Sequence, residues 1–172
     1  MGQIWGRIGG EIGGFDIECS YSEGVIEGRI GGLAQGGDIR LQYDSEETLS
    51  GRIGGDFFGK DVNLRCTEDT IEGRVGGPVI GIEVALHCDE ENWVFHGRCG
   101  GEIIGFDSEL RNVGGIVSGR TGGPLVGKDV AVRFDEDVPF WVACAVCLLA
   151  KYHYDELHRR SGGSSHGGKG RP

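Results

Sequence analysis

Apolar and polar residues alternate along most of the chain, in short runs that glycine-rich or acidic segments separate. In the run that starts at Asp38, Ile39, Leu41 and Tyr43 share one face, and charged or polar residues take the other. A period of two residues is typical of a β-strand with one buried face. The pattern therefore predicts a mainly β protein.

The runs belong to an internal repeat. The motif Gly-Arg-x-Gly-Gly begins at six positions, with spacings of 22, 23, 22, 24 and 22 residues. Each motif is followed by a second run of alternating apolar and polar residues, which begins near a glycine and an acidic residue. Two strands per repeat predict twelve strands, and connections this short favour antiparallel neighbours. Such a set of strands favours a closed antiparallel 12-stranded barrel, because closure removes both sheet edges.

One apolar run, from Val138 to Ala150, differs from the strands because it is apolar on every side. Pro139 near its start and the polar sequence after it predict a helix over residues 139–160. A twelve-stranded barrel is about 20–23 Å across, and an α-helix with its side chains is about 10–12 Å across. We therefore expect the apolar part of the C-terminal helix to fill the barrel and the polar part to protrude.

We expect one domain over residues 1–160 and a flexible polar tail over residues 161–172. Within the helix, we expect Phe140, Trp141, Leu148 and Leu149 to be structural. The first glycine of each motif falls on the inward face, where a wall without side chains would allow the helix to approach closely. These structural glycines are Gly6, Gly28, Gly51, Gly73, Gly97 and Gly119.

The arginine of each motif faces outward, near the acidic residue of the next strand. We expect these residues to pair across strands, with each pair contributing about 0.2–1 kcal/mol. Their role would then be to set the strand register, not to form a site. The acidic partners are Asp16, Asp38, Asp61, Glu83, Asp107 and Asp129.

Twelve antiparallel strands around an apolar C-terminal helix, with the segment DVPFWVACAVCLLA at 137–150, resemble a known plan. The plan is that of the tubby C-terminal domain, the phospholipid scramblases and the plant LURP-one-related family. The resemblance covers residues 4–160 and implies a non-enzymatic module that binds a protein partner or a membrane surface. Phosphoinositide binding by the tubby domain relies on a basic face. Because this chain has a net charge of −10, lipid binding is not transferred to any residue.

Candidate chemistry is sparse. Cys144 and Cys147 have CxxC spacing, but on an apolar helix we expect buried, inert thiols and no metal site. The acidic turns between strands are interpreted as solvated turns, with weak calcium binding as the alternative. No serine, cysteine or histidine constellation indicates a nucleophile with a base. We therefore expect no enzymatic activity and no cofactor.

Charge and cysteine content restrict the partners and the compartment. The net charge of −10 excludes a nucleic-acid binder, which needs a basic surface. The N-terminus carries no secretory signal pattern and the six cysteines are sparse, so we expect a cytoplasmic, reducing location. The thirteen-residue apolar run is too short to span a membrane. We expect a monomer that binds a protein or an anionic membrane surface, the latter through the basic tail.

Two alternatives remain open from the sequence. One is a structural or hydrophobic-ligand-carrying barrel in which the helix is a displaceable plug. The other is a parallel six-coil β-solenoid capped by the helix.

Overall fold

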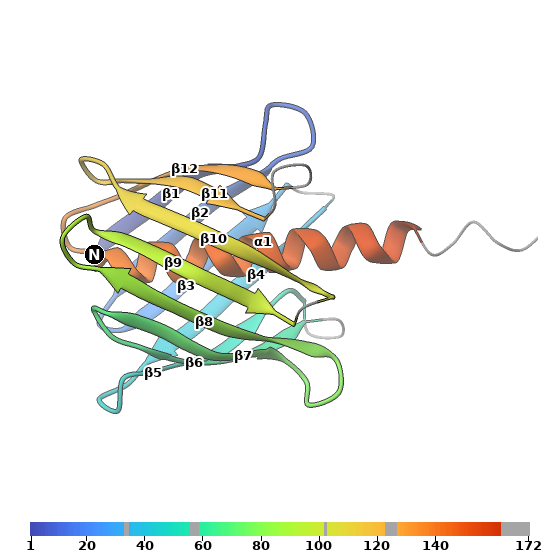
Figure 1. The fold of residues 1–172 in the computed structure, drawn as a ribbon, viewed down its shortest axis with the longest axis horizontal. Helices are drawn as coiled ribbons and strands as arrows, with labels where there is room; N and C mark the ends of the chain where they lie inside the picture. The colour runs from blue at the N-terminus through green and yellow to red at the C-terminus, as the bar shows by residue number, and fades with distance from the viewer. Residues whose placement is uncertain (33–34, 56–58, 102, 123–126, 163–172) are drawn as a thin grey trace, which may run out of the picture.

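The computed structural model describes the chain except for residues 33–34, 56–58, 102, 123–126 and 163–172. The described residues form twelve strands and one helix, shown in Figure 1. The strands are β1 (Gly2–Ile8), β2 (Phe15–Ser22), β3 (Val25–Gly31), β4 (Gly36–Tyr43), β5 (Thr48–Ile53), β6 (Lys60–Cys66), β7 (Thr70–Gly76), β8 (Gly81–Asp89), β9 (Val94–Gly100), β10 (Gly105–Asn112), β11 (Ile116–Thr121) and β12 (Lys128–Phe134). The helix is α1 (Phe140–Gly162).

Each strand pairs antiparallel with its sequence neighbours, and β1 pairs antiparallel with β12. The closing register runs from Ile4 opposite Phe134 to Ile8 opposite Val130. The barrel is thus closed, as the repeat predicted. The β-solenoid alternative is wrong, because its coils would place parallel strands side by side.

The alternating pattern places one apolar set of side chains inside the barrel. On β6, Val62, Leu64 and Cys66 are buried, whereas Asp61 and Asn63 are exposed. The other strands follow the same pattern around the ring. The inward residues, chiefly Ile, Leu and Val, form one continuous core with the helix.

Helix α1 runs along the barrel axis (Figure 1) and contacts strands on all sides, including β1, β4, β7 and β10. Every side chain from Val142 to Ala150 is buried. An apolar helix surrounded by an apolar wall leaves no face for water, which explains why this run lacks the one-sided pattern of a surface helix. Leu148 and Leu149 lie within this buried stretch.

Aromatic side chains close the barrel where α1 begins. Phe140 packs against Phe95, with ring centroids 5.5 Å apart, and also stacks on Phe134. Trp141 is buried against Tyr43, with ring centroids 4.6 Å apart. Phe140 and Trp141 thus pack against aromatic side chains of the wall.

The polar part of the helix does not protrude where the sequence predicted. Lys151, Tyr152 and His153 directly follow the apolar run, and all three are buried. The strands and the glycine loops extend the wall further than expected, so that the His153 ring lies beside Gly37 and Gly54. Exposure of the helix begins near His158, where it leaves the barrel (Figure 1). Of the predicted tail at 161–172, residues 163–172 lie outside the described residues.

Candidate functional site

The six motif glycines have a different structural reason from the one predicted. Gly6, Gly51, Gly73, Gly97 and Gly119 have φ between 140° and 155°, a backbone conformation that other residues rarely adopt. A Cβ atom added at any of the six would overlap a backbone carbonyl oxygen of the neighbouring strand. The closest approach at these glycines is therefore between neighbouring strands of the wall.

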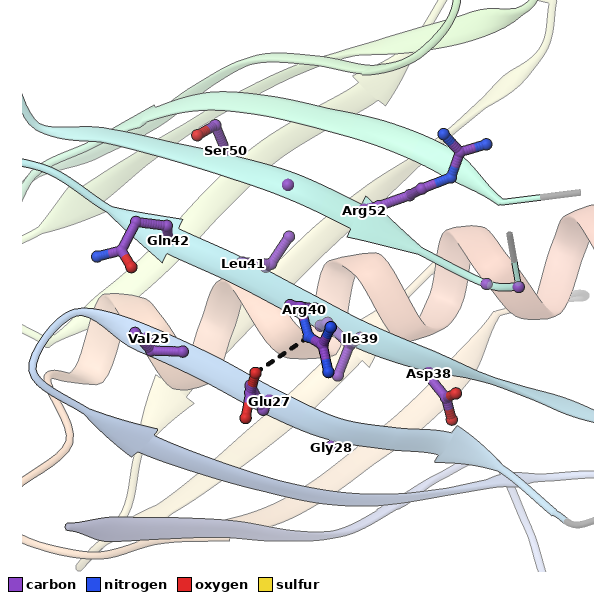
Figure 2. A pocket seen from close by; sticks show the side chains of 13 residues that line it. Val25, Glu27, Gly28, Asp38, Ile39, Arg40, Leu41, Gln42, Ser50 and Arg52 are labelled. Carbon is purple, nitrogen blue, oxygen red and sulfur yellow. Dashed lines mark ion pairs between the residues drawn. The ribbon is translucent and has the colours of Figure 1, made fainter. Parts of the chain in front are cut away.

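Shallow furrows on the outer surface of the barrel run past several of the motif glycines. One of them has a volume of about 980 Å³ and lies over β3, β4 and β5, beside Gly28 and Gly51 (Figure 2). Arg40 and Arg52 line it, together with the polar side chains of Glu27, Asp38, Gln42 and Ser50. Two further furrows lie beside Gly73 and Gly97, with volumes of about 490 and 840 Å³.

The predicted pairing between arginine and acid is confirmed in all six repeats. In each repeat the two residues lie directly opposite each other on adjacent strands and form a salt bridge. The pairs are Arg7–Asp16, Arg29–Asp38, Arg52–Asp61, Arg74–Glu83, Arg98–Asp107 and Arg120–Asp129.

The same arginines also hold the glycine loops. Arg74 Nε donates to the Gly77 carbonyl oxygen at 3.1 Å, and Arg98 Nε donates to the Gly101 carbonyl oxygen at 3.2 Å. Each arginine thus links its own loop to the next strand. Because the pairs are largely exposed, each contributes at most about 1 kcal/mol. The repeated arginines serve the fold, as the sequence indicated.

The end of the barrel where α1 emerges carries exposed apolar side chains. Ile12 and Ile103 are each 97% exposed and Val79 is 91% exposed, and Ile80 and Ile104 are exposed beside them. All lie in loops that follow a Gly-Arg-x-Gly-Gly motif. We call these five residues, with their loops, the apolar rim.

Sequence reasoning missed the apolar rim, although its signal is present in the sequence. Every connecting segment of this kind carries at least one large apolar residue between its glycines. The remaining copies are Leu33, Phe57, Phe58, Leu125 and Val126, which lie outside the described residues.

The opposite end of the barrel is acidic. Its turns surround the start of α1 and the N-terminus (Figure 1) and contain no lysine or arginine. Their carboxylates are Glu23, Asp44, Glu46, Glu47, Glu68, Asp69, Asp89, Glu90, Glu91, Asp135, Glu136 and Asp137. The two ends of the molecule therefore differ sharply in character.

The interior offers no reactive thiol. Burial raises the pKa of Cys144 well above its usual range, and it raises the pKa of Cys147 as well. Burial also raises the pKa of Cys99 to about 12. A neutral thiol is a poor nucleophile and a poor metal ligand. Across the described part of the chain, no group of His, Cys, Asp or Glu side chains is placed to hold a metal ion.

One charged side chain is enclosed near the mouth of the barrel. Lys151 is 4% exposed, and its Nζ atom lies 2.6 and 2.5 Å from the two carboxylate oxygens of Asp155. The same atom lies 4.9 Å from the centre of the Phe106 ring. The ion pair and the ring together compensate the burial of the ammonium group. For the barrel to carry a hydrophobic ligand, α1, which bears the Lys151–Asp155 ion pair, would have to leave its interior.

Comparison with protein-family models, with curated proteins and with solved structures finds no match for this chain. Among the described residues, no helix combines the length and the apolar character that crossing a membrane requires.

Proposed function

We propose that the protein is a non-enzymatic binding module that docks on a membrane surface through its apolar rim. The observation that supports the proposal is the gathering of Ile12, Val79, Ile80, Ile103 and Ile104 at one end, in exposed loops. Removing an aliphatic side chain of this size from water contributes about 1.5–3 kcal/mol. Several shallow insertions of this kind hold a protein at the boundary between headgroups and acyl chains.

Charge supports the same orientation. After Glu156 the sequence contains four basic residues, Arg159, Arg160, Lys169 and Arg171, and no acidic residue. This basic segment continues from the helix that leaves the barrel at the apolar rim. Attraction of basic residues to anionic lipid contributes about 1 kcal/mol each near the surface, and the acidic turns at the other end face away from it. An anionic membrane would therefore attract the end of the barrel with the apolar rim and repel the acidic end.

The resemblance to the tubby and scramblase group is consistent with this proposal and stays a prediction. The membrane proposal itself rests on the apolar rim and not on that resemblance. A protein partner with an apolar surface is the other occupant that the rim would suit, and the experiment below separates the two.

Sedimentation with phosphatidylcholine vesicles that contain phosphatidylglycerol tests the proposal. We expect wild-type protein to bind, and Ile103→Asp to weaken binding by about tenfold or more, since one apolar insertion is lost and a charge is added. Ile12→Asp should act in the same way. Because both side chains are almost fully exposed, neither change should alter the unfolding temperature.

The control is Val113→Asp, which makes the same kind of change at an exposed apolar residue of the acidic end. It should leave vesicle binding unchanged. Failure of the wild-type protein to bind, or equal losses for Ile103→Asp and Val113→Asp, would contradict docking through the rim. Absent vesicle binding would leave a protein partner as the occupant.

A further inference from the structure

Six positions of the wall lie around α1 where the helix leaves the barrel. Each comes from the start of an even-numbered strand and lies opposite the x residue of the Gly-Arg-x-Gly-Gly motif on the preceding strand. The six positions are therefore equivalent by register, although the side chains that occupy them differ. They are Phe15, Gly37, Lys60, Ile82, Phe106 and Lys128.

Three of these positions hold the emerging helix directly. The Phe15 ring meets the Tyr154 ring edge-on, with centroids 5.0 Å apart, and Lys128 Nζ lies 4.7 Å from the centre of the same Tyr154 ring. Lys60 Nζ lies 3.8 Å from Glu156 Oε2. Side chains of β2, β6 and β12 therefore close the space between the wall and these parts of α1.

A hollow remains between α1 and the wall on the side of β8 and β10. Its volume is about 440 Å³, within the range of about 300–1,000 Å³ that is typical of small-molecule sites. Ile82, Phe106 and Tyr152 line it and are buried, whereas Ile103 and Ile104 line it and are exposed. We call this space the rim hollow, because two of its residues belong to the apolar rim.

The charged side chains that line the rim hollow already have partners. Asp155 accepts from Lys151, with an Nζ to Oδ1 distance of 2.6 Å, and Arg159 Nη2 lies 2.9 Å from Glu156 Oε1. Each pair is neutral as a whole. An ionic ligand would therefore gain little here, whereas a hydrocarbon group would gain by removing the isoleucine and phenylalanine surfaces from water.

We infer that the rim hollow takes up one acyl chain of a membrane lipid. Ile103 and Ile104 belong both to the hollow and to the apolar rim, so the hollow opens at the surface that faces the membrane in the proposed orientation. A chain enters there while α1 stays in the barrel. The inference rests on the proposed membrane docking for the source of the chain, and it adds a defined place where a lipid is held.

The repeat provides a matched pair of residues for testing this inference. Ile80 and Ile104 each directly precede the glycine that starts an even-numbered strand, and they are 65% and 61% exposed. Both belong to the apolar rim. Ile104 lines the rim hollow, whereas Ile80 is not among its lining residues. The two residues therefore separate contact with the membrane surface from uptake of a chain.

Titration of the full-length protein with dioctanoyl phosphatidylglycerol, below the concentration at which this lipid forms micelles, tests the hollow without a membrane. NMR of the isoleucine methyl groups reports the place of binding. We expect saturable shifts of the Ile82 and Ile104 methyl signals and no shift at Ile12, which lies elsewhere on the rim. Glycerophosphoglycerol, the same headgroup without acyl chains, should shift none of them.

Two variants locate the binding. Ile104→Asp should weaken binding of the short-chain lipid by about tenfold or more, because a carboxylate replaces an apolar lining residue. The matched control, Ile80→Asp, should leave it unchanged. Ile82→Lys should weaken it as well, and this variant should fold because lysine already occupies the equivalent places at Lys60 and Lys128.

Three outcomes would overturn the inference. They are the absence of saturable shifts at Ile82 and Ile104, shifts that the headgroup alone reproduces, and equal weakening by Ile104→Asp and Ile80→Asp.

Sedimentation with the phosphatidylglycerol vesicles separates this inference from the proposed function. Ile80→Asp should weaken vesicle binding and keep binding of the short-chain lipid. Vesicle binding by a wild-type protein that does not bind the short-chain lipid would overturn the hollow alone. Short-chain lipid binding without vesicle binding would contradict the membrane proposal, and with it the membrane as the source of the chain.

Discussion

At the scale of single residues, the repeated glycines meet a local backbone requirement of the wall. At Gly73 the φ of 140° and the nearby carbonyl oxygen of Asn63 exclude any side chain. Gly73 therefore meets a requirement of strand pairing in the wall, and not a requirement of a binding site.

Replacing Gly73 by alanine tests this requirement. We expect Gly73→Ala to lower the free energy of unfolding by about 1–3 kcal/mol or more, from backbone strain and overlap with β6. Urea denaturation measures the change. Gly10→Ala is the control, because a Cβ atom there meets no atom within 4 Å. Equal stability of Gly73→Ala and wild type would show that the strand tolerates the side chain.

The buried thiols give a second prediction at this scale. Cys144 and Cys147 should not react with a thiol reagent at pH 8 until urea unfolds the protein, whereas half-buried Cys88 should react first. Cys88→Ser should remove that first reaction. Rapid native-state modification of Cys144 or Cys147 would contradict their burial.

The raised thiol pKa values also set a direction for alkaline stability. The Cys99 pKa rises from 9.0 to about 12 on folding. Between pH 9 and pH 12, therefore, the thiol loses its proton in the unfolded chain but keeps it in the folded protein. Cys19 and Cys66 behave alike. The contribution of these thiols to the free energy of unfolding is therefore fully present below pH 9, and it decreases as the pH rises from 9 toward 12.

At the scale of elements, helix α1 supplies the inner half of the core. It contacts strands around the ring, among them β1, β4, β7 and β10, and Val142, Val146 and Leu149 belong to one core with the inward side chains of the wall. Without this helix, the apolar side chains that line the ring of twelve strands would face water. The helix therefore acts as a structural part of the barrel, consistent with its burial on every side.

Deleting residues 138–172 tests the dependence of the barrel on α1. We expect the shortened chain to lose cooperative unfolding and near-ultraviolet circular dichroism, because its inward Ile and Leu side chains lose their partners. Deleting only 163–172, which begins after the helix, is the control and should keep both signals. Cooperative unfolding of the chain without α1 would show that the wall is stable alone.

At the scale of the whole molecule, closure and polarity decide where partners bind. A closed barrel has no free strand edge, so recognition falls to side chains and loops. One end presents the apolar rim and the other presents carboxylates, while the wall carries paired charges and furrows.

The sequence by itself determined the strands, their number, their antiparallel order and the buried helix. Alternation such as Val62, Leu64 and Cys66 is local, and the six motif copies extend it around the ring. The pairing of Arg98 with Asp107 was also predictable, because strand register follows from the repeat.

Only the tertiary structure decided the features that depend on distances between strands. The reason for Gly73 lies in a carbonyl oxygen ten residues away, and the burial of Lys151 depends on how far the wall extends. The opposition of Arg40 and Arg52 depends on the register of β4 and β5. Periodicity reports which side of an element is buried. The height of the barrel, the gathering of loop tips at one end and the shape of its outer surface arise only when all twelve strands close.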